Sequence, residues 1–149
     1  MELLDTVRSV LRSKGQEVWQ ISPDACVYDA IEMMALKRVG ALLVISEGRL
    51  VGVVSERDYA RKVILQGKSS KESLVKEIMA SPAICVTPDQ SVESCMRVMT
   101  EKHIRHLPVV EEGGILGVVS IGDLVKWMIS AQRHTISQLH DYISNKYPG

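Results

Sequence analysis

Apolar residues along this chain alternate between helical spacing and short unbroken runs. In residues 27–34 they recur at intervals of three and four, which predicts one face of a helix. Two apolar runs follow, residues 41–45 and 50–54, and the short polar stretch between them predicts a β-hairpin loop. A short strand over 18–21 precedes the helix, and another helix is expected to begin near Glu56. The pattern therefore predicts a unit ordered as strand, helix, strand, strand, helix.

This unit occurs twice at a constant offset of 65 residues, and residues 18–64 are matched without a gap. The run Gly-Val-Val-Ser that ends at Ser55 recurs with its end at Ser120, and Asp58 recurs as Asp123. One unit alone has a thin core, whereas two copies packed face to face can bury their sheets. The sequence thus predicts an α+β fold of two repeats related by pseudo-twofold symmetry.

Further helical patterns lie outside the repeats. A predicted N-terminal helix has one apolar face, formed by Leu3, Leu4, Val7, Val10 and Leu11. The segment between the repeats begins with a loop-like Gly-Lys-Ser-Ser and then becomes helical in pattern. We divide the chain into an N-terminal helix, a first repeat, a connecting segment, a second repeat and a helical tail, which cover residues 1–15, 16–65, 66–81, 82–130 and 131–149.

The tail continues the last helix of the second repeat to about Ser144. One apolar stripe follows it, interrupted by Gln132 and formed by Val125, Met128, Ile129, Ile136, Leu139 and Ile143. Such a stripe needs a partner, either the chain's own domain or a second subunit. We expect a homodimer, and we expect the N-terminal helix to join the same surface.

Composition narrows the class of protein. The 149 residues are 46% hydrophobic and include 18 basic and 18 acidic side chains, so the chain reads as globular with no net field for nucleic acid or an anionic membrane. No apolar run is long enough to span a bilayer, and no signal peptide is evident. Three cysteines without a C-x-x-C motif fit a reducing compartment, and we expect a cytoplasmic protein.

The repeated ending Gly-h-h-Ser-x-x-Asp, where h is apolar, resembles the CBS-domain family, and the chain looks like a stand-alone CBS pair (a Bateman module). The resemblance covers about residues 18–129. It implies nucleotide sites in the cleft between repeats and dimers of pairs. It also implies ligands that contain adenosine, among which AMP or NAD is expected first, with ATP, ADP and S-adenosylmethionine as further candidates.

Two Ser-x-x-Asp motifs are the central candidates for binding. A carboxylate such as Asp58 or Asp123 can accept hydrogen bonds from the two hydroxyls of a ribose. The hydroxyl of Ser55 or Ser120, together with amides at a helix start, suits a phosphate. The same spacing is also that of a capping box, in which serine and acid satisfy the helix start themselves. Spacing leaves both roles open, and they can coexist; only the resemblance favours binding.

The resemblance also implies that an adenine would be bound around the start of the second strand of each repeat. The matching positions are Val39, Gly40 and Ala41 in the first repeat, and Ile104, Arg105 and His106 in the second. Ser22 and Thr87 lie at the end of the first strand of each repeat. Each could either hydrogen-bond to the base or cap the helix that follows.

Near the second motif, Gly122 replaces Arg57 of the first repeat, so a phosphate could approach the backbone beside Val119. Arg57 could instead supply charge to an anion or be a solvated surface residue.

Other chemistry has little support in the sequence. His103 and His106 have no accompanying cysteine or acid cluster, so no metal is expected. No nucleophile, base and orienting group form a set, and no G-x-G-x-x-G motif is present. The leading hypothesis is a regulatory nucleotide sensor that acts in trans on an unknown partner. The alternative is a structural dimerisation or interaction module without functional ligand sites, and an enzyme is the least favoured hypothesis.

Overall fold

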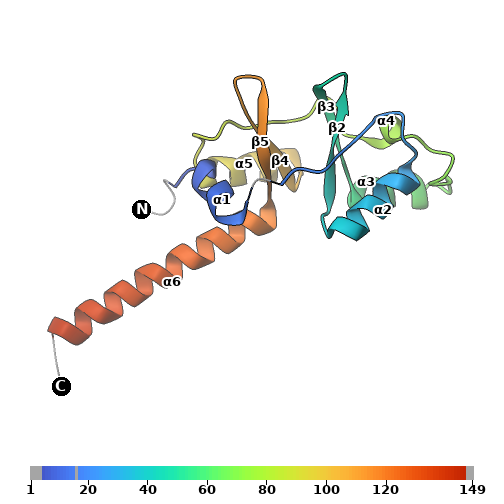
Figure 1. Cartoon of the computed structure of the whole chain (residues 1–149). Helices are drawn as coiled ribbons and strands as arrows, with labels where there is room; N and C mark the ends of the chain where they lie inside the picture. The colour runs from blue at the N-terminus through green and yellow to red at the C-terminus, as the bar shows by residue number, and fades with distance from the viewer. Residues whose placement is uncertain (1–4, 16, 147–149) are drawn as a thin grey trace. The chain divides into compact units, whose positions relative to one another are not determined.

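The computed structural model describes residues 5–15 and 17–146 (Figure 1). Leu3 and Leu4 of the predicted N-terminal helix, and the last three residues of the tail, lie outside the described residues. The elements in chain order are α1 (Val7–Lys14), β1 (Gln20–Ile21), α2 (Val27–Lys37), β2 (Ala41–Ser46), β3 (Arg49–Ser55), α3 (Glu56–Tyr59), the π-helix η2 (Ala60–Ile64), α4 (Val75–Ile78), α5 (Val92–Lys102), β4 (His106–Glu111), β5 (Gly114–Ser120) and α6 (Ile121–Lys146).

The two predicted repeats are confirmed as strand, helix, hairpin and helix. In the first, β1 pairs in parallel with β2, which pairs antiparallel with β3. In the second, β4 and β5 form the same antiparallel hairpin, and a single parallel bridge from Val86 to Val109 takes the place of the first strand. Each hairpin turns through two residues with positive φ, Glu47-Gly48 and Glu112-Gly113, which matches the twist of the flanking strands.

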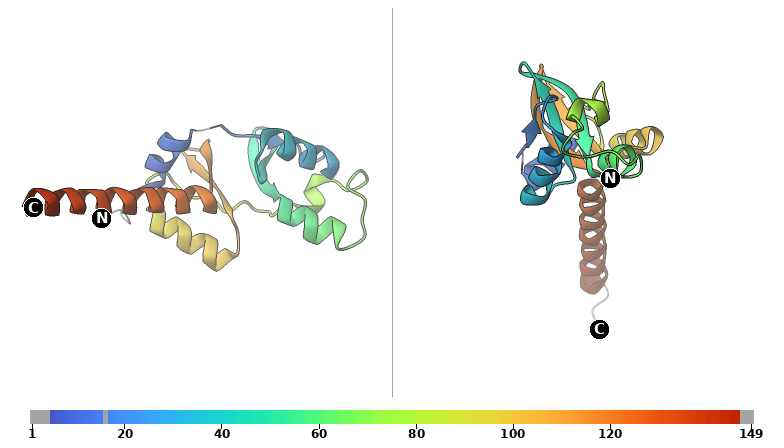
Figure 2. Two further views of the ribbon diagram at one scale, coloured as in Figure 1. Left: turned by 90° about the horizontal axis from the view of Figure 1, so that it is seen from below. Right: turned by 90° about the vertical axis from the view of Figure 1, so that its right-hand side faces the viewer.

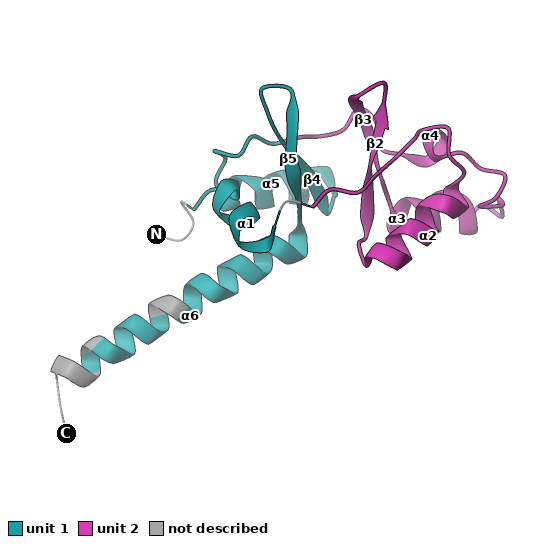
Figure 3. Ribbon diagram, viewed as in Figure 1, with its two compact units in different colours: residues 1–16, 86–149 teal, residues 17–85 magenta. Residues whose placement is uncertain are grey.

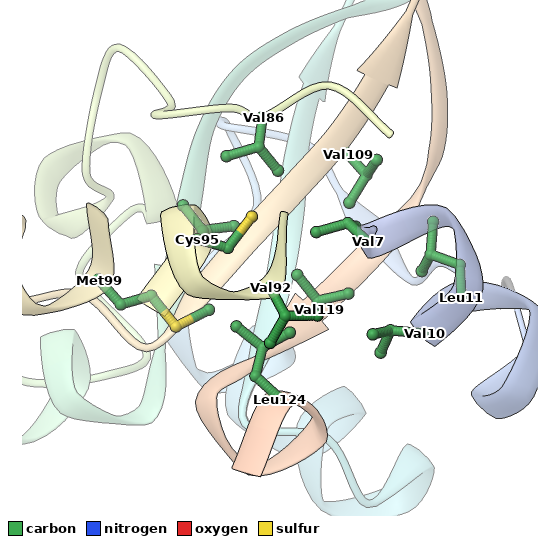
Figure 4. Packing of buried hydrophobic residues seen from close by; sticks show 11 residues of the cluster. Val7, Val10, Leu11, Val86, Val92, Cys95, Met99, Val109, Val119 and Leu124 are labelled. Atoms are coloured by element: carbon green, nitrogen blue, oxygen red, sulfur yellow. The ribbon is translucent and has the colours of Figure 1, made fainter. Parts of the chain in front are cut away.

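The chain forms two compact units, one of which combines segments from both ends of the sequence (Figure 3). Residues 17–85 make one unit, and residues 1–16 with 86–149 make the other. The apolar face of α1 is therefore part of the core of the second repeat, where Val7, Val10 and Leu11 are at most 2% exposed (Figure 4). We expected this helix to join a dimer surface, but these three side chains are buried within the unit and are not available for one.

Helix α4 occupies in the first repeat the place that α1 occupies in the second. An isolated bridge joins Leu74, just before α4, to Cys26, just before α2. The corresponding bridge joins Thr6, just before α1, to Ser91, just before α5. Each repeat is thus completed by a short helix that docks beside the start of its longer helix.

Glycines in the third strand of each repeat make these helices fit. A Cβ atom added at Gly52 would lie 2.7 Å from the carbonyl oxygen of Ala80, and one at Gly117 would lie 2.9 Å from Cδ2 of Leu11. Both distances are shorter than real Cβ contacts allow. The two glycines mark close approach of a neighbouring segment, as their position in strands indicates.

Helix α6 is the longest element, with 26 residues. Its first turns pack on the second repeat: Leu124 is fully buried, and Trp127 donates a hydrogen bond of 2.9 Å to Asp5. The rest of the helix extends beyond the other elements of its own unit (Figure 2). No helix among the described residues has both the length and the apolar character needed to cross a bilayer.

Candidate functional site

The first Ser-x-x-Asp motif lies where β3 gives way to α3. The amide of Asp58 donates to Oγ of Ser55 at 3.2 Å, and the amide of Ser55 donates to Oδ2 of Asp58 at 2.9 Å. The Ser55 hydroxyl also donates to the same Oδ2 at 3.0 Å. Nζ of Lys62 stands 3.6 Å from the other carboxylate oxygen, Oδ1. The motif therefore forms a complete capping box, with a lysine beside the acid.

The second motif has the same local geometry between β5 and α6. The amide of Asp123 donates to Oγ of Ser120 at 3.0 Å, and the amide of Ser120 donates to Oδ2 of Asp123 at 2.8 Å. Its lysine comes from a different place: Nζ of Lys14, at the end of α1, donates to the same Oδ2 at 2.6 Å. Lys14 also donates to the carbonyl oxygen of Val118 at 2.8 Å.

These contacts set the charge state of the second acid. Partial burial alone would raise the pKa of Asp123, but the hydrogen bonds from Lys14 and Ser120 and the nearby ammonium charge outweigh it. The pKa of this carboxyl is therefore held below its usual value. Asp123 is an ionised acceptor at neutral pH and is neutralised locally by Lys14.

In the first repeat, the predicted base-binding stretch adjoins the motif. Gly40 accepts a hydrogen bond of 3.1 Å at its carbonyl oxygen from the amide of Glu56, the first residue of α3. Ala41 stands opposite Ser55 in the register of β2 and β3. Val39 is half-buried against the core of the repeat. Gly40 and Ala41 thus lie at the end of the hairpin where the acid and hydroxyl are presented.

The second repeat has the same arrangement with larger side chains. The carbonyl oxygen of Arg105 accepts a hydrogen bond of 2.9 Å from the amide of Ile121. His106 stands opposite Ser120 in the register of β4 and β5. Ile104 packs against the core, whereas Arg105 is exposed. Besides Lys14, the polar residues at this end of the hairpin are therefore Arg105 and His106.

The residues at the end of the first strand are not part of this cluster within their own repeat. Because β1 runs parallel to β2 with Ile21 beside Val44, Ser22 continues toward the hairpin turn and away from Ala41. Four residues of strand separate these positions, or roughly 13 Å. Oγ of Ser22 accepts a hydrogen bond of 3.1 Å from the amide of Asp24, so the serine supports a local turn.

Thr87 has the corresponding place in the second repeat. It follows the bridge between Val86 and Val109 and is exposed. Its amide donates to Oε1 of Gln90 at 3.1 Å. As with Ser22, the observed role is in the turn that precedes the helix.

The remaining candidates differ in what they can offer a ligand. Val119 is fully buried in the core of the second repeat, where its side chain packs and does not face a ligand. Gly122 is exposed, and a Cβ atom there would meet only Oγ of Ser120, at 3.6 Å. Arg57, its counterpart, is partly buried at the start of α3. At this one position, the second motif therefore has no side chain where the first has an arginine.

Lys14 is a site residue that the sequence reasoning missed. It lies 109 residues from Asp123 in the chain, and no motif links the two positions. The available signal was the resemblance of α1 to α4, which indicates that both short helices dock beside a repeat. In the described part of the chain, no three His, Cys, Asp or Glu side chains gather in a way that could hold a metal ion.

The model of the CBS domain family matches residues 7–64 and 75–130. The CBS domain-containing protein CBSX3, mitochondrial, of Arabidopsis thaliana is 40% identical over 95% of this chain and 73% of that protein. A solved CBS-domain protein of Burkholderia ambifaria is 48% identical with a TM-score of 0.82, covering 85% of this chain and 96% of that one.

A third relative shares only the fold. It is the CBS domain pair of protein MJ0100, solved with 5′-methylthioadenosine and S-adenosylmethionine, at 22% identity and a TM-score of 0.76 over 86% of this chain and 98% of that one. The two matched ranges begin at α1 and at α4, the helices that complete the second and first repeats. With two matched domains that cover most of its length, the chain belongs to the CBS-domain family as a tandem pair.

Proposed function

We propose that this protein is a regulatory sensor that binds a nucleotide containing adenosine. CBS pairs are regulatory modules, and this chain has both copies. The observation that carries the proposal is the repeated turn in which a strand ends at a serine and an ionisable acid follows three residues later. The same turn is present at Ser55 and Ser120, with hydrogen-bond distances that agree within about 0.2 Å.

Each carboxylate can hold a sugar without giving up its capping role. In the second repeat, the amide of Ser120 and the ammonium of Lys14 both donate to Oδ2 of Asp123. We assign Oδ1 to the hydroxyls of a ribose, since a carboxylate oxygen accepts more than one hydrogen bond. In the first repeat, both bonds from Ser55 end on Oδ2 of Asp58, and Oδ1 has the same assignment.

A phosphate fits best beside the second motif. The ammonium of Lys14 has three N–H groups, of which Asp123 and Val118 accept two. The open position at Gly122 lets an anion approach the first turn of α6. AMP or NAD is the ligand we favour, with ATP or ADP also fitting this chemistry, and the solved pair with S-adenosylmethionine supports the adenosine moiety.

The test is calorimetric titration of the full chain with AMP, ADP, ATP, NAD, NADH and S-adenosylmethionine. We expect at least one to bind at submillimolar concentration, and Asp123→Ala to weaken binding by about 10- to 100-fold through loss of charged hydrogen bonds. Asp24→Ala is the matched control, because Asp24 is an exposed acid outside both motifs. Failure of all six ligands at millimolar concentration would reject the sensor.

Lys14 separates phosphate recognition from adenosine recognition. Lys14→Gln should weaken AMP by about tenfold and leave adenosine within about twofold, because only the phosphate uses the ammonium. Equal losses for both ligands would assign Lys14 to holding Asp123 in place and not to the phosphate.

A second candidate function is a structural interaction module. It is favoured by the observation that Asp58 and Asp123 already satisfy the helix starts of their own repeats. If this is the function, a variant with Asp58 and Asp123 both changed to alanine would still self-associate and still bind its partner. The unchanged protein would bind no nucleotide. The titrations above decide between the two.

The wider setting is part of the same proposal. We propose a homodimer that acts in trans on a separate regulated protein, without catalysis, metal, nucleic acid or membrane. The cysteines Cys26, Cys85 and Cys95 are free, which supports a reducing compartment such as the cytoplasm. Activity of a purified partner that changes with nucleotide only when this chain is present would support action in trans.

A further inference from the structure

Beyond its packed first turns, α6 keeps an apolar stripe exposed, interrupted by Gln132. Among the described side chains of this stripe, Ile136 is 66% exposed and Leu139 is 58% exposed, and Ile129 and Ile143 are 44% and 49% exposed. They follow Leu124 in the chain, and the later part of α6 extends beyond the other elements of its unit (Figures 1 and 2). Most of the stability of a helix in a protein comes from packing of its apolar face, so this exposed stripe calls for a partner.

The spacing of the stripe is that of a heptad repeat. Ile129, Ile136 and Ile143 are seven residues apart and occupy position a. Three residues after each a position come the d positions, which include Leu139 and Gln132. Isoleucine at each of these a positions, together with the leucine at d position 139, favours a parallel two-stranded coiled coil. We propose that α6 pairs with α6 of a second copy of this chain, in parallel and in register, through this stripe.

Gln132 supports pairing in register. In a parallel dimer, each d residue faces the same residue of the other copy, and the glutamine amide carries both donors and acceptors, so two such amides can hydrogen-bond to each other. An antiparallel pair that overlaps the whole stripe would instead place Gln132 against Ile136 of the other copy. The buried amide would then lack a partner, which is costly.

The charged side chains beside the stripe independently favour the same parallel orientation. The e positions beside the stripe carry Lys126, Arg133 and His140, all of which are exposed, and the g positions carry no acid. Antiparallel coiled coils bring e positions together, so Arg133 would face its own copy, and Lys126 would face His140. Parallel coils pair e with g and avoid this repulsion. Both arguments favour the parallel orientation. A second copy is favoured as the occupant because, in that orientation, each a isoleucine and Gln132 face their own equivalents, so that the stripe is complementary to itself.

This inference specifies the homodimer proposed above and is tested without any nucleotide, so its failure is distinct from failure of ligand binding. The variant is Ile136→Asp, and the matched control is Ser137→Asp, which adds the same charge one residue away on an exposed position outside the stripe. Sedimentation of the full chain over a range of concentrations should show self-association weakened by at least about 100-fold in Ile136→Asp only. Unchanged thermal unfolding of the repeats verifies that the variant folds.

Orientation is tested by a single cysteine at position 129 in a background where the three native cysteines are replaced. Ile129→Cys should form a disulfide between copies under mild oxidation, because equal a positions face each other in a parallel coil. In the antiparallel arrangement the two cysteines would be about 15 Å apart along the axis, beyond disulfide reach. A monomeric chain, self-association that survives Ile136→Asp, or self-association without this disulfide would overturn the proposal.

Discussion

The contact between Lys14 and Asp123 offers the sharpest test of the structure. It joins α1 to the start of α6 across 109 residues of chain, through a hydrogen bond of 2.6 Å. The perturbation is a cycle of three variants: Lys14→Gln, Asp123→Asn and both together. Asparagine keeps a side-chain oxygen for the amide of Ser120, so the cap survives while the charge is lost.

The expected coupling follows from the exposure of the pair. The side chains of Lys14 and Asp123 are 35% and 24% exposed, so solvent screens part of their attraction. Exposed ion pairs contribute up to about 1 kcal/mol, and hydrogen bonds to charged groups contribute about 1.5–3 kcal/mol. For this half-buried pair we expect a coupling of about 1 kcal/mol, which corresponds to a shift in melting temperature of roughly 3 °C for a chain of this size.

The pH dependence adds a second signature. Because the pKa of Asp123 is lowered in the folded protein, its contribution to stability is complete above the unfolded value of 3.8 and is lost as pH falls through the folded pKa. The difference in melting temperature between the unchanged protein and Lys14→Gln should therefore be constant from pH 5 to 7. Below about pH 3.8 it should shrink.

Thermal unfolding followed by circular dichroism, at pH 7 and at steps down to pH 3, measures both quantities. The matched control is Lys62→Gln with Asp58→Asn, a looser contact of 3.6 Å from α3 to the adjoining η2, four residues apart in the chain, for which we expect about 0.3–0.5 kcal/mol. Additive effects of Lys14→Gln and Asp123→Asn at pH 7 would show that the two side chains do not interact and would refute the assigned docking of α1.

Three further predictions concern packing. Gly52→Ala should destabilise the chain more than Gly117→Ala, as urea unfolding would measure, because the first clash is with the backbone of Ala80 at 2.7 Å and the second with the flexible end of Leu11. Leu11→Ala should lower the free energy of unfolding by about 2–5 kcal/mol and should speed amide hydrogen exchange in the second repeat but not in the first. Faster exchange in the first repeat alone would contradict the division into units. Burial raises the pKa of Cys95 to about 11, so iodoacetamide at pH 8 should label it only after unfolding, and rapid labelling of the native chain would show that its core is open.

The local pattern of apolar residues was sufficient to predict the order of the helices and strands in each repeat. Helical spacing predicted α2 and α5, and the unbroken apolar runs predicted both hairpins to within about two residues, because periodicity reflects burial of one face. The capping turns at Ser55 and Ser120 were also readable, since their hydrogen bonds link residues three apart in the chain. These features depend on neighbours in sequence and are therefore determined by the sequence itself.

The candidate site was only partly readable in this way. The family resemblance placed Ala41 and His106 in the surroundings of an adenine, and strand register places each opposite the serine of its repeat. It also grouped Ser22 with the same cluster, whereas parallel pairing of β1 with β2 carries Ser22 toward the other end of the sheet. The parallel direction of β1 relative to β2, which the apolar pattern of a short strand does not specify, decided the difference.

Tertiary structure alone decided where the short helices dock. The apolar face of α1 predicts burial but not a partner, and the same three side chains could have covered a dimer surface or either repeat. The fold places them in the core of the second repeat, and Lys14 thereby reaches Asp123. Hydrophobic burial is non-directional, so sequence determines which surfaces must be covered, whereas the shape and spacing of the assembled core select what covers them.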